Sequence, residues 1–245
     1  TDNPLYGGPL TEWKFRVACL VESCTERGWF PNVSVTEYGY SPIPGNSRAP
    51  TSGASQTSQA VYYLRTCLMN GTMRIPGANW KYSMYFHHPR DEYELGFHAT
   101  DNFPGSSRAI RYIAREIGCA TGNSPGLCAP GSTIWSPLRT REEGSYTYSA
   151  WCGWKREDGQ LVGAIWQYGH EPTYFQPTPT ARAFIVEGNY NGIDAYLYEF
   201  EISDGAASFQ SAGDPVSGIY NSGTGETTWT IPGVYENPIF LLIDN

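Results

Sequence analysis

The chain has 245 residues, of which 40% are hydrophobic and only 16% are charged, which suits one large all-β domain with a substantial core. Its formal net charge is −8, and we expect no contact with nucleic acid, because binding phosphate requires clustered basic groups. No apolar run approaches the ~18–20 residues of a membrane span, so we expect no membrane insertion.

The N-terminal third is predicted to combine strands with one long loop. Residues 13–21 alternate between apolar and polar side chains, which is typical of a strand. Residues 41–59 are rich in Ser, Pro, Gly and Thr and are interpreted as a loop. Residues 60–69 fit either a helix face or a strand, and their Val and Tyr residues favour the strand. Another strand is predicted at residues 79–86.

One helix is predicted, over residues 107–118. Ser106 or Ser107 is placed to cap it, and an apolar stripe follows at positions three and four apart. The remaining predicted elements are all strands, at residues 145–154, 161–168, 181–187, 193–202, 227–231 and 239–243. With no visible repeat or linker, residues 1–245 are predicted to form a single all-β domain, an antiparallel β-barrel or sandwich with one short helix.

Residues 145–170 are predicted to form a β-hairpin that is rich in aromatic residues, with its turn at Asp158-Gly159. Side chains alternate along a strand, so the even-numbered residues share one face. This face is interpreted as core, and it comprises Tyr146, Tyr148, Cys152, Trp154, Trp166 and Tyr168. The opposite face is half polar and is expected to meet water; it carries Thr147, Ser149 and Trp151.

The candidate binding residues lie on this hairpin. An exposed Trp151 is costly unless a partner covers it. The charged tip at residues 155–158 suits recognition, because it is carried on a rigid stem. We therefore predict that the binding residues are Trp151, Lys155, Arg156 and Asp158.

The six cysteines leave two interpretations open. Cys119 and Cys128 flank a turn-rich loop that a disulfide could close, and Cys19 and Cys24 could also bridge with poorer geometry. The alternative is six buried thiols, since free Cys is among the most buried residues. No Cys-x-x-Cys pair is present, which disfavours a structural zinc site.

Patterns for catalysis are weak. Glu199 and Glu201 alternate beside aromatic residues, but side chains two apart on one strand point in parallel, whereas hydrolase carboxylates face each other across a substrate. The sequence His87-His88-Pro-Arg is better explained as a polar loop than as a metal site. No nucleophile elbow or nucleotide-binding glycine loop occurs. We predict a non-catalytic protein with no metal and no cofactor.

Three features together resemble one protein family: the acidic, Tyr- and Trp-rich β composition, the closing segment at residues 227–244, and ends that look cut from a longer polypeptide. They are similar to the projecting domain of a non-enveloped virus capsid, most specifically the astrovirus capsid spike. The resemblance covers the full length without a signature motif, so it assigns no binding residues. It implies a β-barrel-like homodimer on the virion surface that attaches to a host-cell receptor, protein or glycan, and attracts neutralising antibodies. The helix predicted at residues 107–118 departs from the nearly all-β character expected of such spikes.

The alternative is a secreted carbohydrate-active protein, either a lectin or a glycoside hydrolase, with an aromatic-lined groove. The flanking sequence separates the two hypotheses. An upstream basic, capsid-like region and a downstream acidic tail favour the spike, whereas an upstream signal peptide favours secretion.

The hairpin tip provides a first test. Changing both Lys155 and Arg156 to Ala is expected to leave folding intact, because a charged turn contributes little to the core. The same change is expected to weaken partner binding, measured as the Kd for receptor-bearing cells. Unchanged binding would place the contact site elsewhere.

Overall fold

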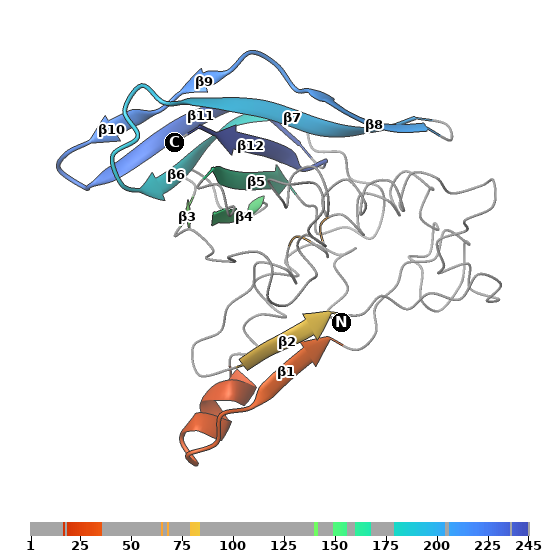
Figure 1. Ribbon diagram of the computed structural model, residues 1–245, viewed down its shortest axis with the longest axis vertical. Helices are drawn as coiled ribbons and strands as arrows, with labels where there is room; N and C mark the ends of the chain where they lie inside the picture. Colours follow the sequence, from red (N-terminus) through yellow and green to blue (C-terminus); the bar gives the residue numbers. More distant parts are fainter. Residues whose placement is uncertain are drawn as a thin grey trace.

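The computed structural model describes residues 17, 19–35, 65, 68, 79–83, 140–141, 149–155, 160–167, 179–203, 206–235 and 237–244. These residues form mostly antiparallel β-sheet with one short helix (Figure 1). The sheets are not closed into a barrel, so the described part of the chain has the sandwich-like form of the predicted all-β fold.

The larger sheet contains the aromatic hairpin and the C-terminal strand. Its strands are, in spatial order, β4 (Ser149–Lys155), β5 (Leu161–Gln167), β12 (Ile239–Ile243), β7 (Asp194–Ser203) and β8 (Ala206–Ser211), with β9 (Val216–Ser217) also paired to β7. All of these pairings are antiparallel. The last strand in sequence therefore lies at the centre of the sheet and joins the hairpin to the rest of the domain.

The second sheet packs against one face of the first. It consists, in spatial order, of β10 (Ile219–Asn221), β11 (Glu226–Val234), β6 (Thr180–Glu187) and β3 (Thr140–Arg141). A separate parallel pair is formed by β1 (Asn32–Val35) and β2 (Asn79–Ser83). The strands from β6 onward run nearly continuously to the C-terminus and make up most of the sandwich.

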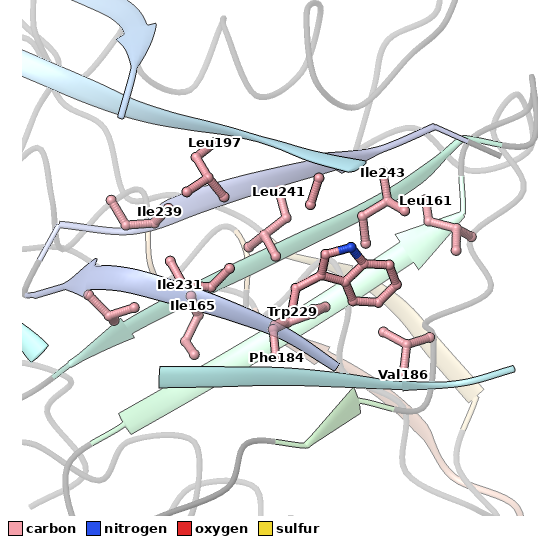
Figure 2. Close-up of a cluster of buried hydrophobic side chains, with 12 residues drawn as sticks. Leu161, Ile165, Phe184, Val186, Leu197, Trp229, Ile231, Ile239, Leu241 and Ile243 are labelled. Carbon is pink, nitrogen blue, oxygen red and sulfur yellow. The ribbon is translucent and has the colours of Figure 1, made fainter. Parts of the chain in front are cut away.

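The hydrophobic core lies between the two sheets (Figure 2). The larger sheet contributes its odd-numbered residues, because side chains alternate between its faces. They meet aromatic and branched side chains of β6 and β11. The fully buried members are Leu161, Ile165, Ala195, Leu197, Ile239, Leu241 and Ile243 from the larger sheet, and Phe184, Val186, Trp229, Ile231 and Val234 from the second.

The hairpin is buried on both faces. Every residue of β5 is buried, so its even-numbered side chains are covered as well as the odd-numbered ones that face the core. Trp154 and Trp166 lie on that even-numbered face with exposed fractions of 0% and 1%. The prediction that the even-numbered face is core is confirmed for these two residues and for Cys152. Tyr146, Tyr148 and Tyr168 lie outside the described residues.

On the opposite face, the predicted environment of Trp151 is wrong. Trp151 pairs with Ile165 across the β4–β5 ladder, so both side chains lie on the same face of the sheet. That face packs on the second sheet, and Trp151 is partly buried against the core cluster. Alternation along the strand divides the hairpin residues into two faces, but it does not say which face a second sheet covers.

The N-terminal region is helical where a strand was predicted. Residues 19–25 form a helix, as does residue 17, so the strand at residues 13–21 is wrong there. Gly28 has φ 75°, and two backbone bonds close the helix end: Gly28 N–H to Thr25 C=O at 2.9 Å and Trp29 N–H to Cys24 C=O at 2.9 Å. These are the two bonds of a Schellman cap.

Other predictions for the helical and strand segments have mixed outcomes. Arg65 and Leu68 are helical, which corrects the strand predicted at residues 60–69. The helix predicted at residues 107–118 lies outside the described residues. Within the described residues, the six strands predicted from residue 145 onward are confirmed as β4, β5, β6, β7, β11 and β12.

The two sheets approach each other closely at Gly163 of β5. A Cβ atom there would lie 2.4 Å from Cζ of Phe184, whose ring is fully buried. Gly163→Ala is therefore expected to lower the free energy of unfolding by about 1–3 kcal/mol, because the ring must move within a packed core. Gly233→Ala is the matched control, since a Cβ at that strand position meets no atom within 4 Å. Equal urea midpoints for the two variants would contradict the close packing.

Candidate functional site

Two loops meet at one end of the sandwich and form the candidate recognition surface. Residues 188–193 connect β6 to β7, and residues 222–225 connect β10 to β11 (Figure 1). The loops are joined by a hydrogen bond from Gly188 N–H to Gly225 C=O, and a second bond joins Gly192 N–H to the carbonyl of Gly218, which precedes β10; each is 2.9 Å long. We call these two loops, together with Gly218 and β10, the loop surface.

Glycine and asparagine produce these tight connections. Gly192 and Gly225 both have φ 74°, a left-handed conformation that other residues rarely adopt. Asn-Gly pairs favour tight turns, and Asn191-Gly192 lies in the connection from β6 of the second sheet to β7 of the larger sheet. Each loop thus turns within a few residues, so its side chains are held close to the ends of the strands.

A buried threonine fixes the first loop to the sheet below it. Thr227 is fully buried on β11, and its hydroxyl oxygen accepts the Tyr190 N–H at 2.9 Å. The same hydroxyl donates to the Gly188 carbonyl at 2.7 Å. One side chain therefore satisfies a donor and an acceptor of the loop backbone, which would be costly to leave unpaired.

Aromatic packing fixes the rest of the loop. The Tyr190 ring lies over Trp229, with the ring centroids 6.0 Å apart and the planes inclined by 43°. The buried indole of Trp229 also donates from Nε1 to the Ile193 carbonyl at 3.0 Å. The hydrophobic core and the loop surface therefore share Trp229.

Three exposed asparagines shape the outer part of the surface. The Oδ1 atom of Asn189 accepts the Asn191 N–H at 3.1 Å. The Oδ1 atom of Asn191 accepts the Tyr220 N–H at 3.2 Å, which links the first loop to β10. The Oδ1 atom of Asn221 accepts the Gly223 N–H at 2.9 Å. All three side chains are held by backbone groups within the surface.

The chemical character of the loop surface is polar and uncharged. Residues 188–193 and 218–225 contain no Lys, Arg, His, Asp or Glu. Ile219 adds an apolar side chain that is 69% exposed. Asn, Ser, Gly and Tyr are the residues that adaptable recognition surfaces use. This surface is not among the sites predicted from the sequence.

The structure separates the predicted binding residues of the hairpin. Trp151 is partly buried towards the core, whereas Lys155 is exposed at the end of β4. The two residues are four positions apart, or about 13 Å along a strand. Arg156 and Asp158 lie outside the described residues, and their role in binding stays a prediction. Cys119 and Cys128 also lie outside them, so the possible disulfide between these two residues stays a prediction.

Lys155 lies at the same end of the larger sheet as the loop surface. The strand register places it opposite Leu161, which pairs with Ile243, which pairs with Ala195. Ala195 is two residues beyond the loop at residues 188–193. Three strand spacings, or about 14 Å, separate β4 from β7 along this row. Lys155 and the loop surface therefore lie at the same end of the domain.

Glu199, considered above as a hydrolase carboxylate, has a structural contact. Its carboxylate accepts a hydrogen bond from the Tyr235 hydroxyl, and the group is partly buried on the core side of β7. The backbone of Tyr235 in turn accepts the Gln167 N–H at 2.7 Å. The contact ties β7 to β5 and to the chain that follows β11. The side chain of Glu201 is not among those described.

The described part of the chain contains no group of three or more His, Cys, Asp or Glu residues that could hold a metal ion. Cys19, Cys24 and Cys152 are free thiols, so the bridge considered between Cys19 and Cys24 is not formed. Within the same residues, no helix has the length and apolar character needed to cross a bilayer.

Comparison with known proteins gives no match, either to a protein-family model or to a curated protein. The function is therefore argued from the residues and their geometry.

The loop anchor yields a direct test. Thr227→Val keeps the shape of the side chain but leaves the Tyr190 N–H and the Gly188 carbonyl without their partner. The free energy of unfolding is expected to fall by about 1–3 kcal/mol, and hydrogen exchange at Tyr190 is expected to accelerate. Thr228→Val is the control, because the neighbouring Thr228 hydroxyl makes no hydrogen bond among the described residues. If both variants leave hydrogen exchange at Tyr190 unchanged, the Thr227 hydroxyl is not needed to hold the loop.

Proposed function

We propose that this chain is a non-catalytic attachment domain, displayed as a homodimeric capsid spike on the surface of a non-enveloped virus of the astrovirus type. In this role it binds a receptor on the host cell and is exposed to neutralising antibodies. The observation that carries the proposal is the loop surface, which is uncharged, exposed and held rigidly at one end of a sandwich.

The rigidity of the loop surface supports a recognition role. Each loop is bonded to the other, and Thr227 and Trp229 connect the first loop to buried strands. A preorganised surface loses less conformational entropy when a partner binds, so more of the contact energy appears as affinity. Binding residues on loops that a rigid scaffold positions are a common arrangement in recognition domains.

The chemistry of the described groups also suits binding better than catalysis. The asparagine side chains and Ile219 offer hydrogen bonds and apolar contact, whereas none of them is a general acid, base or nucleophile at neutral pH. Lys155 adds one positive charge at the same end of the domain. These groups provide orientation and contact area for a partner.

Binding to cells tests the proposal. The purified domain, labelled with a fluorophore, is expected to bind one or more cultured cell types saturably and to be displaced by unlabelled domain, as measured by flow cytometry. Ile219→Asp is expected to weaken this binding by about tenfold or more, because it places a charge in a desolvated contact.

Leu20→Asp is the matched control, since Leu20 is a comparably exposed apolar residue on the N-terminal helix, with 64% of its surface accessible. Its affinity for cells is expected to equal that of the unchanged domain. The proposal is contradicted if no cell type is bound saturably, or if Ile219→Asp and Leu20→Asp behave alike.

A further inference from the structure

The loop surface presents hydrogen-bond donors in fixed positions. In Asn189, Asn191 and Asn221, the Oδ1 atom is occupied by a backbone N–H of the surface. Of the two terminal atoms of a side-chain amide, only the oxygen can accept from an N–H group, so the backbone partner determines the orientation of each amide. The Nδ2 group of each side chain is then the part that remains for other contacts.

These amide nitrogens make no hydrogen bond of their own among the described residues. Each carries two N–H donors and sits on an exposed side chain. They come from two connections that are about 30 residues apart in the sequence, and the Asn191 bond to Tyr220 brings them together. The surface therefore offers a cluster of donors to a ligand that is rich in acceptors.

The charges around the cluster restrict that ligand further. Glu187 precedes the first loop and is exposed, and Asp194 follows it. Residues 188–193 and 218–225 contain no Lys or Arg. The loop surface therefore has no cation to pair with the carboxylate or sulphate of a charged sugar, whereas the hydroxyl and acetamido oxygens of a neutral sugar need only neutral donors.

The apolar component of the surface fits the same ligand. Ile219 is 69% exposed and directly precedes Tyr220, whose backbone N–H is held by Asn191. A pyranose ring combines oxygen atoms along its edge with an apolar face of C–H groups. Donors beside an exposed aliphatic side chain can engage both parts at once.

We propose that the loop surface binds a neutral, non-sialylated glycan, with the side-chain amides of Asn189, Asn191 and Asn221 as donors and Ile219 against the sugar ring. The inference rests on the proposed function, because it names the class of receptor that the attachment surface recognises.

A glycan array that contains neutral, sialylated and sulphated members tests the inference, with the domain presented as a tetramer to increase avidity. The domain is expected to bind neutral glycans and is expected not to bind sialylated or sulphated ones. Asn191→Asp and Asn221→Asp keep an oxygen acceptor for the loop backbone but remove the donors, and each is expected to weaken binding by about threefold to tenfold.

Thr230→Asp is the matched control, because it adds the same charge to an exposed position of β11 outside the loop surface and keeps all three amides. Circular dichroism checks that each variant is folded. Equal losses in Thr230→Asp and Asn221→Asp would assign the effect to charge and overturn the inference. Binding to sialylated or sulphated glycans alone would overturn it as well.

Treated cells separate this inference from the proposed function. Periodate oxidation of cell-surface sugars is expected to abolish binding of the domain, while trypsin treatment is expected to leave part of it. Cell binding that resists periodate and is lost after trypsin identifies a protein receptor, which overturns the glycan inference and leaves attachment standing. Absence of binding to every untreated cell type contradicts the attachment function itself.

Discussion

The packing of β5 between two covered faces is the constraint on which the rest of the structure depends. Its odd-numbered residues meet the second sheet, and its even-numbered residues are equally buried. Gly163 allows the second sheet to pack closely on its face of β5, since the absence of a side chain lets Phe184 approach the strand. Trp154 and Trp166 fill the other side, and rings of that size bury about 150–250 Å² each. The hairpin is therefore a central structural element.

The loop surface is held in place by residues of this core. Trp229 is a fully buried member of the cluster, yet its indole nitrogen bonds the loop carbonyl of Ile193 and its ring contacts Tyr190. Thr227, two residues earlier and also buried, holds the other side of the same loop. Thr227 and Trp229 are held in place by the packed core, and the loop is bonded to both of them. The packing of the core therefore sets the positions of the exposed amides in the loop.

The strands could be predicted from the sequence because hydrophobic runs and turn residues are local signals. The segments at residues 161–168 and 239–243 are almost continuously apolar, and Asn191-Gly192 marks the turn before β7. The side of the hairpin that faces the second sheet could not be predicted in this way. Trp151 was assigned to water because its strand neighbours are polar, whereas the register that pairs it with Ile165 is a non-local property.

The candidate site illustrates the same limit. Asn189, Asn191 and Asn221 are ordinary turn residues in the sequence, and nothing local indicates that they belong together. The pairing of β11 with β6 and with β10 brings their loops to one end of the sheet. For the N-terminal helix, by contrast, a local signal existed: Gly28 lies where a helix cap requires a left-handed residue. The alternation of apolar and polar residues at 13–21 favoured a strand instead. A segment of nine residues is short enough to fit both the strand period of 2 and the helix period of about 3.6.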